Sequence, residues 1–134
     1  MISGKSAPVV LVVDDKDSIT TTLTLILAQQ GFAAIPARTA EEAVGLARET
    51  SPDCLVCDIV MGKMNGIQAA IEILSLCPGC RVILMSGHNT AGELIDSARE
   101  RGFDFEILAK PFHPRVLLER LRGWNLLPGS IESA

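Results

Sequence analysis

The stretch PVVLVVDD, residues 8–15, decides the fold of this chain. Its apolar, β-branched run does not alternate with polar residues, which predicts a strand buried on both faces of a sheet. Strands of this kind occur in parallel sheets that carry helices on each side. The run ends in two adjacent aspartates, and the reason for two carboxylates at the exit of a buried strand must lie in what other strands bring to the same place.

Four more short strand-like runs follow, and a segment of helical period separates each run from the next. The runs are FAAIPA (32–37), CLVCD (54–58), RVILMS (81–86) and FEILA (105–109). Strict alternation of strands and helices predicts an α/β fold, a doubly wound parallel sheet of five strands with five helices, because each right-handed crossover places its helix on one face of the sheet.

Local signals indicate where the five helices begin. We expect Asp17 or Ser18 to cap the first helix, Thr39 with Glu42 to form a capping box for the second, Gly66 to open the third, Thr90 with Glu93 to form a capping box for the fourth, and Pro114 to lie in the first turn of the fifth. Leu117, Leu118 and Leu121 should form the packing stripe of that last helix.

Composition restricts the class of protein. The chain has 134 residues, of which 48% are hydrophobic and 21% charged, as expected for one globular domain. No apolar stretch reaches the roughly 18 residues that a membrane span needs. The first eight residues lack the apolar core of a secretion signal, so we expect a cytoplasmic protein with no membrane partner. A net charge of −4 gives no basic footprint for direct nucleic-acid binding.

Polar side chains stand at the exits of four predicted strands: Asp14 and Asp15, Asp58, Ser86 and Lys110. In a parallel α/β sheet these exits meet at one edge, where ligands bind. Three converging carboxylates repel one another unless a cation shares the site. Because the available ligands are hard oxygens and no histidine stands at these exits, Mg²⁺ is favoured, with Mn²⁺ as a second choice. A nearby ammonium suits a phosphoryl group bound to that ion.

The four cysteines suggest a competing reading. Cys54, Cys57, Cys77 and Cys80 form two C-x2-C pairs at a spacing that fits a zinc ribbon. However, Cys54 and Cys57 lie three positions apart in one predicted strand, so their side chains should point to opposite faces of the sheet. The other pair flanks a turn at the amino end of the next strand. We therefore expect small buried side chains and a turn rather than a zinc site or a structural disulfide.

From residue 8 to about residue 123, the chain resembles the receiver domain of two-component response regulators. The resemblance rests on VDD after the first strand, DIVMGKMNG (58–66), MSG after the fourth and KPF after the fifth. It implies the flavodoxin-like strand order 2-1-3-4-5. Residues 1–7 would then be an N-terminal extension, residues 8–123 the receiver domain, and residues 124–134 a C-terminal tail or linker.

The resemblance implies a role for each residue of the acidic site. Asp58 would be the phosphoacceptor and a metal ligand, Asp15 a direct ligand, and Asp14 a partner acting through metal-bound water. The backbone carbonyl of Val60 would complete the protein's share of the metal shell.

Two further residues would contact the phosphoryl group. The hydroxyl of Ser86 would hydrogen-bond to it, and Lys110 would pair with one of its oxygens. The Lys110–Pro111 peptide would be cis.

The resemblance also implies the biological role. The phosphoryl donor would be a phosphohistidine on a sensor histidine kinase or a phosphotransfer protein. Phosphorylation would change the surface formed by the fourth helix, fifth strand and fifth helix, through which a homodimer could form. The protein would be a signalling domain and not an enzyme in the ordinary sense, although it catalyses its own phosphorylation and dephosphorylation.

Two other classes remain as alternatives. One is a phosphorylation-independent interaction module of the same fold, which need not keep all of the acidic pair, Asp58, Ser86 and Lys110. The other is a phosphatase with an aspartyl nucleophile, which expects a D-x-D pattern on the first strand. The DDKD of residues 14–17 supplies that pattern only out of register.

The sequence departs from the family pattern at positions that affect signalling. Gly62 stands where proline is usual, and Ile107 stands where an aromatic residue usually reports phosphorylation. Phe105, two residues before Ile107, is the expected replacement for that aromatic. Val60 and His88 occupy the positions that flank the path of the water attacking the phosphorylated aspartate. An apolar Val60 cannot orient water, so we expect slow loss of the phosphoryl group.

Overall fold

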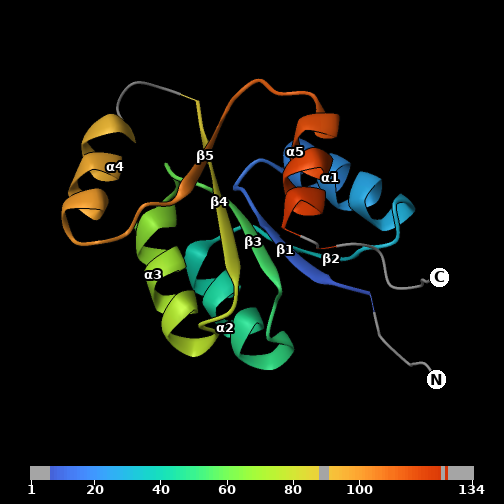
Figure 1. The fold of residues 1–134 in the computed structure, drawn as a ribbon, viewed down its shortest axis with the longest axis horizontal. Helices are drawn as coiled ribbons and strands as arrows, with labels where there is room; N and C mark the ends of the chain where they lie inside the picture. The colour runs from blue at the N-terminus through green and yellow to red at the C-terminus, as the bar shows by residue number, and fades with distance from the viewer. Residues whose placement is uncertain (1–6, 88–90, 125, 127–134) are drawn as a thin grey trace.

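The computed structural model describes residues 7–87, 91–124 and 126, and it contains five strands and five helices in alternation (Figure 1). The strands are β1 (Val9–Val13), β2 (Ala33–Ala37), β3 (Cys54–Asp58), β4 (Arg81–Ser86) and β5 (Glu106–Ala109). The helices are α1 (Asp17–Gln29), α2 (Ala40–Thr50), α3 (Gly66–Leu76), α4 (Ala91–Glu100) and α5 (Pro114–Gly123).

All strand pairs are parallel, and the sheet order is β2-β1-β3-β4-β5. The predicted fold class and strand order are therefore confirmed. The order reverses at β1, because β2 pairs with one edge of β1 and β3 with the other. The carboxyl ends of β1 and β3 consequently lie side by side, which is where a ligand site is expected in a sheet of this type.

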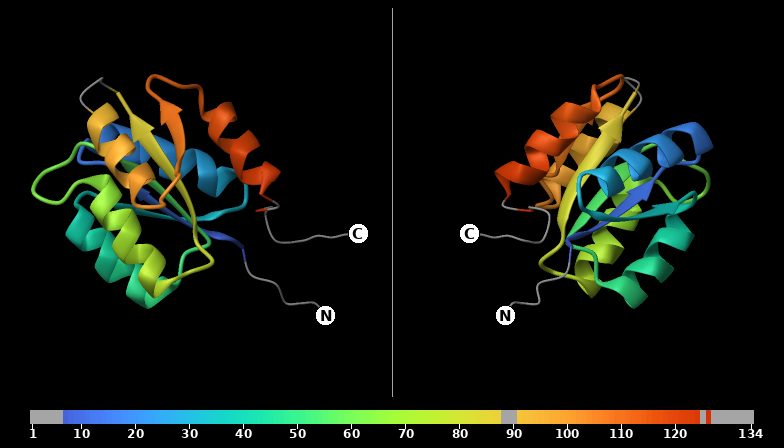
Figure 2. Two further views of the ribbon diagram at one scale, coloured as in Figure 1. Left: turned by 60° about the vertical axis from the view of Figure 1, so that its left-hand side comes forward. Right: turned by 90° about the vertical axis from the view of Figure 1, so that its right-hand side faces the viewer.

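Helices lie on both faces of the sheet (Figure 2). Each face packs against a hydrophobic core of its own. Leu11 and Val13 of β1 face the core that also contains side chains of α2, α3 and α4. Val10 and Val12 face the opposite core, which α1 and α5 cover. Leu117, Leu118 and Leu121 are buried in that second core, so the predicted stripe of α5 is confirmed. Trp124 and Leu126 also pack against it.

The start of α1 differs from the prediction. The N-cap is Lys16, whose side chain makes no cap hydrogen bond, and Asp17 is the first helical residue. Neither Asp17 nor Ser18 is the cap. The backbone satisfies the first turn instead, because the N–H groups of Ile19 and Thr20 donate to the carbonyl of Lys16 at 3.1 and 3.2 Å. Two residues before this cap, the carboxylate of Asp14 accepts a hydrogen bond from the N–H of Lys16 at 2.9 Å, which ties the start of the helix to the acidic site.

Thr39 is the N-cap of the second helix, as predicted, but the capping box is shifted by one residue. The Thr39 side chain accepts from the backbone N–H of Glu42 at 3.0 Å. The Glu42 carboxylate reaches back to the N–H of Arg38, one residue before the cap, at 2.9 Å. The predicted capping box at Thr90 and Glu93 falls partly outside the described residues, which do not include Thr90.

The cap of α3 was not predicted from the sequence, and the cap of α5 was predicted only in part. Asn65 and Gln68 form a complete capping box before α3, with each side chain accepting from the other's backbone N–H at 2.9 Å. At α5, Pro114 occupies the first helical position as predicted. His113 precedes it and accepts a hydrogen bond through Nδ1 from the N–H of Arg115 at 3.0 Å.

The cysteines lie as the strand geometry predicts. Cys54 belongs to the α1/α5 core and Cys57 to the α2/α3/α4 core, so the two side chains are on opposite faces of the sheet. All four cysteines are free thiols. Among the described residues, no cysteine takes part in a cluster of three or more potential metal ligands.

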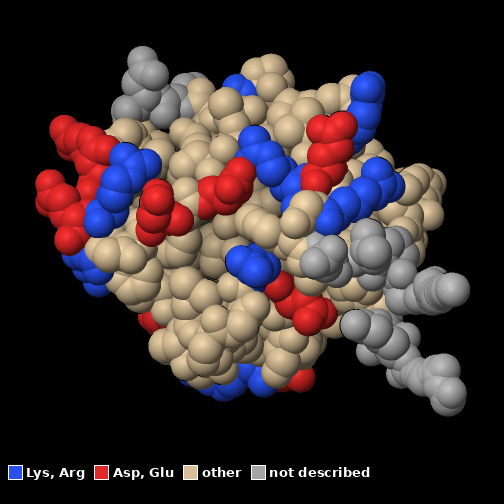
Figure 3. Space-filling model, in the orientation of Figure 1, with Lys and Arg blue, Asp and Glu red and all other residues tan. Residues whose placement is uncertain are grey.

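No helix in the described ranges is long and apolar enough to cross a membrane. On the face shown in Figure 3, acidic and basic side chains are interspersed, without one large patch of either sign.

Candidate functional site

The carboxyl edge of the sheet gathers the polar residues that the sequence placed at strand exits. Asp14 and Asp15 follow β1, and Asp58 is the last residue of β3. One carboxylate oxygen from each of these three aspartates lies within 4.8 Å of the others. The Nζ of Lys110, just after β5, lies 2.8 Å from Asp14 Oδ2 and 3.3 Å from Asp58 Oδ1. The structure therefore brings three carboxylates and one ammonium together.

Ser86 ends β4 at the same edge, opposite Ala109 of β5 in the register of the sheet. Its backbone carbonyl accepts a hydrogen bond from the N–H of Lys110 at 2.9 Å. The Lys110–Pro111 peptide is cis, as the resemblance implies. Ser86 and Lys110 thus leave the sheet side by side, and Ser86 follows Met85, the register partner of Asp58.

The three aspartates differ in burial. Asp14 is fully buried, Asp58 is 6% exposed, and Asp15 is exposed to solvent. Asp14 has partners for both carboxylate oxygens, since Oδ1 accepts from the N–H of Lys16 and Oδ2 from Lys110. A buried carboxylate with two charge-assisted partners is held in one orientation. Asp14 therefore forms the rigid floor of the site, and Asp15 forms its exposed rim.

Burial and the neighbouring charges together set the electrostatics of the site. Burial raises the pKa of Asp58, and the charges of Asp14 and Asp15 raise it further, while Lys110 only partly offsets them. Burial alone would lower the pKa of Lys110. Its hydrogen bond to Asp14 and the charges of Asp58 and Asp14 outweigh burial, so the pKa is raised and the ammonium form is favoured.

These residues fit a divalent cation. Three carboxylates face a single ammonium, so a cation bound here would meet a surplus of negative charge. All of the side-chain donors are oxygens, which hard cations such as Mg²⁺ prefer. Asp14, Asp15 and Asp58 are the side chains that would hold the ion. The four cysteines contribute nothing to this cluster, which is the only group of three or more potential ligands in the described ranges.

The backbone after Asp58 is held by two hydrogen bonds. The N–H of Ile59 donates to the carbonyl of Met85 in β4 at 3.1 Å, and the carbonyl of Ile59 accepts from the N–H of Gly66 at 2.8 Å. Val60 follows with a side chain that is 51% exposed. The site loop is therefore fixed at Ile59 and opens to solvent at Val60.

Gly66 has a steric role that the sequence did not reveal. A Cβ at this position would lie 2.9 Å from the carbonyl carbon of Asp58 and closer still to its oxygen. Backbone atoms cannot give way as the tip of a flexible side chain can, so only glycine fits here without moving the strand end. The glycine at this place in DIVMGKMNG was a usable signal, but the reason for it depends on the packing of α3 against β3.

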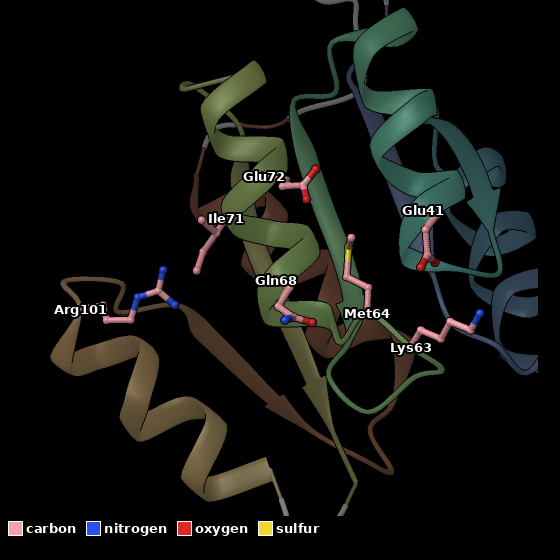
Figure 4. A pocket seen from close by; sticks show the side chains of 7 residues that line it. All are labelled: Glu41, Lys63, Met64, Gln68, Ile71, Glu72 and Arg101. Carbon is pink, nitrogen blue, oxygen red and sulfur yellow. The ribbon is translucent and has the colours of Figure 1, made fainter.

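Two hollows lie near the site. One of about 670 Å³ adjoins Lys110, between α1 and the start of α5, with Ile19, Leu23 and Phe112 in its lining. The other, of about 470 Å³, lies beside α3 (Figure 4). Its lining is Glu41, Lys63, Met64, Gln68, Ile71, Glu72 and Arg101. None of the three clustered carboxylates lines either hollow.

The residues proposed to modulate the site lie at different depths. Phe105 and Ile107 both pack against the core on the α2/α3/α4 side of the sheet, so they share a face as expected. Phe105 precedes β5 and stacks on Phe103, with 5.7 Å between ring centroids. The sequence did not single out Phe103 as its partner. His88 lies outside the described residues.

Comparison with known proteins decides the family. The family model for the response regulator receiver domain matches residues 10–122. The chain belongs to the response regulator receiver family. The chemotaxis protein CheY of Thermotoga maritima is 34% identical to this receiver over 113 residues, which cover 84% of this chain and 92% of that protein.

Other relatives show how widely such receivers are used. The DNA-binding response regulator MtrA of Mycolicibacterium smegmatis is 29% identical over 84% of this chain, which corresponds to 48% of that protein. A CheY-like receiver domain protein from Methanospirillum hungatei superimposes with a TM-score of 0.80 at 26% identity, covering 89% of this chain and 94% of that one. This receiver is thus a signalling domain of the two-component type.

Proposed function

We propose that this receiver accepts a phosphoryl group on Asp58 from a phosphohistidine of a sensor histidine kinase or phosphotransfer protein. The observation that carries the proposal is the position of Lys110. Its ammonium contacts both Asp14 and Asp58, and the three carboxylates of the cluster outnumber this one cation by two. A site of this kind attracts cations and, through them, phosphate oxygens.

Asp58 would act as the nucleophile in this transfer. One carboxylate oxygen attacks the phosphorus while the bond from phosphorus to the imidazole nitrogen breaks, and the nitrogen keeps the bonding pair. No general base is needed, because an ionised carboxylate has no proton to lose. The product is an acyl phosphate, which water later hydrolyses to free carboxylate and inorganic phosphate.

The other residues would position and neutralise, which is most of what a protein contributes to phosphoryl transfer. Lys110 would turn from Asp14 and Asp58 toward a phosphoryl oxygen. Ser86 would donate its hydroxyl to a second oxygen, and the backbone hydrogen bond between Ser86 and Lys110 supports a shared role for the two residues.

A divalent ion completes this charge balance. Mg²⁺, or Mn²⁺ in its place, would supply the positive charge that neutralises the phosphoryl oxygens when it is bound. Asp15, Asp58 and the backbone carbonyl of Val60 would hold it directly, and Asp14 through water. The retention of a buried Asp14, fixed by two hydrogen bonds, supports an assigned place for each carboxylate.

The consequence of phosphorylation would appear on the surface formed by α4, β5 and α5, where a target or a second copy of the chain would bind. We propose a cytoplasmic location for this exchange, and residues 8–123 as the receiver, with residues 1–7 and 124–134 flanking it.

The decisive experiment is intact-protein mass spectrometry after incubation with acetyl phosphate and Mg²⁺. We expect the gain of one phosphoryl group, which neutral hydroxylamine removes because an acyl phosphate is a reactive mixed anhydride. Asp58→Asn should not gain it. Asp96→Asn is the matched control and should label as the parent does, because Asp96 is exposed on α4 and, among the described residues, pairs only with Arg99, at 3.6 Å.

Labelling of the Asp58→Asn protein would show that another residue is the nucleophile. Failure of the parent to label, with Mg²⁺ bound and the fold intact, would favour the phosphorylation-independent interaction module instead.

A further inference from the structure

The turn between α3 and β4 carries a cysteine at each end, in the sequence Cys77-Pro78-Gly79-Cys80. The backbone N–H of Cys80 donates to the carbonyl of Cys77 at 3.0 Å, which closes the turn. The Cα atoms at the ends of a β-turn lie within about 7 Å of each other. Disulfides join Cα atoms about 4.4–6.8 Å apart, so the backbone already holds this pair within bonding range.

The two thiols differ in access. Cys77 is partly exposed, and Pro78 and Gly79 beside it are exposed, so the turn is open to a small reagent. Cys80 is only 6% exposed. The other two cysteines, Cys54 and Cys57, are fully buried in the sheet. Of the four thiols, Cys77 is therefore the one that solvent reaches first.

Neither thiol of the turn is held strongly where it lies. The Cys77 thiol donates to the carbonyl of Ala47 at 3.6 Å, and the Cys80 thiol to the carbonyl of Arg81 at 3.5 Å. Thiols are weak donors, and the Ala47 carbonyl also accepts from the N–H of Ser51 at 3.0 Å. Rotation of the Cys77 side chain toward Cys80 therefore leaves no backbone group of α2 without a partner.

We propose that Cys77 and Cys80 are a modification site, which a small-molecule disulfide oxidises to an intramolecular disulfide. The Cys77 thiolate attacks one sulfur of the reagent, the reagent's S–S bond breaks, and one half leaves as a thiolate. The Cys80 thiolate then attacks the Cys77 sulfur of the mixed disulfide and expels the second half. The protein pair loses two electrons and two protons, and the reagent gains both.

The order of the two steps follows from burial. Burial raises the pKa of Cys80 to about 12, with the nearby Cys77 as a further cause, so Cys80 is a poor first nucleophile. It acts only once the turn presents a disulfide beside it. Cys54 also lies close enough to Cys80 for the two to interact, since burial and then the charge of Cys80 raise the pKa of Cys54. However, Cys54 faces the other core of the sheet and is fully buried, which excludes it as the partner.

The modification site is separate from the phosphoacceptor site. Cys80 precedes β4 at its amino end, whereas Ser86 ends the same strand at the acidic site. Cys80 also lines a hollow of about 410 Å³ together with Phe103, Phe105 and Trp124. Because the chain contains one tryptophan and no tyrosine, the fluorescence of Trp124 is a specific reporter of changes in this hollow.

The test uses the reduced 134-residue chain and oxidised glutathione as the probe, followed by alkylation and peptide mass mapping. We expect the parent to form a Cys77–Cys80 disulfide, to carry no glutathione at the end, and to regain both thiols with dithiothreitol. Cys80→Ser should stop at a persistent glutathione adduct on Cys77. Cys77→Ser should stay reduced. Trp124 fluorescence should fall in step with disulfide formation in the parent alone.

Three outcomes would overturn the proposal: a parent that keeps all its thiols free, a parent in which glutathione stays on Cys77, or a disulfide that includes Cys54. Each is distinguished by the alkylation pattern. Since no phosphoryl donor or metal is present, the result does not depend on whether Asp58 is a phosphoacceptor.

Discussion

At Gly66, a hydrogen atom occupies the place where any other residue would put a Cβ against the Asp58 peptide. We expect Gly66→Ala to push the end of β3 away from α3 and so to displace Asp58. Displacements of about 1 Å at a reacting group can reduce rates by about 10²-fold. The labelling rate at saturating acetyl phosphate should therefore fall by about that factor.

Gly62→Ala is the matched control for this change. It lies in the same loop, and a Cβ there meets nothing within 4 Å. It should label at the parent's rate. Urea unfolding of both variants separates a general loss of fold from displacement of the nucleophile, and equal labelling by the two proteins would show that Gly66 does not position Asp58.

The side chain of Val60 should affect how long the phosphorylated form lasts. Its side chain is 51% exposed two residues after Asp58 and offers no polar atom to hold a water. We expect Val60→Asn to speed the loss of the phosphoryl group about tenfold, the effect of roughly one well-placed hydrogen bond. The measurement is the decay of the phosphorylated mass after acetyl phosphate is removed. Val60→Ala should decay as the parent does, because it adds no group that orients water; equal acceleration in both variants would mean that steric access controls hydrolysis.

The location of a single residue in the fold could be predicted where its position relative to a strand was enough to determine it. Asp14, Asp15, Asp58 and Lys110 were placed together from their positions at strand exits, because parallel strands end at one edge. The steric role of Gly66 could not be predicted, because it depends on how closely α3 approaches the backbone of β3.

At the level of elements, the period of the hydrophobic residues and the length of each segment were enough to predict the five strands and five helices. This is because β-branched runs and apolar stripes persist over many residues. β3 and β4 have the predicted bounds, whereas β5 begins one residue later than predicted. Helix starts were less predictable because several polar residues compete for the same backbone groups. At α1 the backbone carbonyl of Lys16 accepts from the first-turn N–H groups and no side chain caps the helix, whereas at α3 the Asn65–Gln68 pair forms the cap.

The proposed signalling surface gives a prediction for α4 and β5. Ile107 is stiff at χ1 because it is β-branched, so it has little freedom to swing. Phe105 packs in the same core and stacks on Phe103, which gives an aromatic pair that can shift together. We expect a beryllium fluoride mimic of the phosphoryl group to change hydrogen exchange in peptides covering α4 and β5. Phe105→Ala should weaken this response, and Ile107→Ala should leave most of it.

The opposite pattern would mean that a small aliphatic movement at Ile107 carries the signal. The parent protein without the mimic and Asp58→Asn with it are the controls, and neither should respond.

On the scale of the whole molecule, the acidic site is a source of instability that other parts of the fold must offset. The sheet brings Asp14, Asp15 and Asp58 together whether or not a cation is present, because strand order and register are set by the two cores. The sequence could predict this convergence but not its balance. How far Lys110 compensates depends on burial and on the 2.8 and 3.3 Å distances from its ammonium.

The last prediction follows from the direction of one pKa. The pKa of Asp58 in the folded protein is raised above its ordinary value of 3.8, so the folded state binds more protons than the unfolded state between that value and the raised one. In metal-free buffer, the contribution of Asp58 to the free energy of unfolding is therefore most favourable at low pH and declines as the pH rises through this window. Asp58→Asn removes the charge at nearly constant shape, and it should unfold at a higher temperature than the parent at neutral pH.

Mg²⁺ should reverse the order of stability of the two proteins, so that the parent unfolds at a higher temperature than Asp58→Asn. An ion that binds only the folded state stabilises it by about 2.7 kcal/mol at a concentration 100 times its Kd. The Asp58→Asn protein lacks one of the ligands and should gain less. Thermal unfolding of both proteins in chelator and in Mg²⁺ measures the two effects, with Asp96→Asn as the control that should follow the parent in both buffers. A parent that is more stable than Asp58→Asn in chelator, or an equal gain from Mg²⁺ in both, would show that the carboxylate cluster is not strained by its charge and does not hold the ion through Asp58.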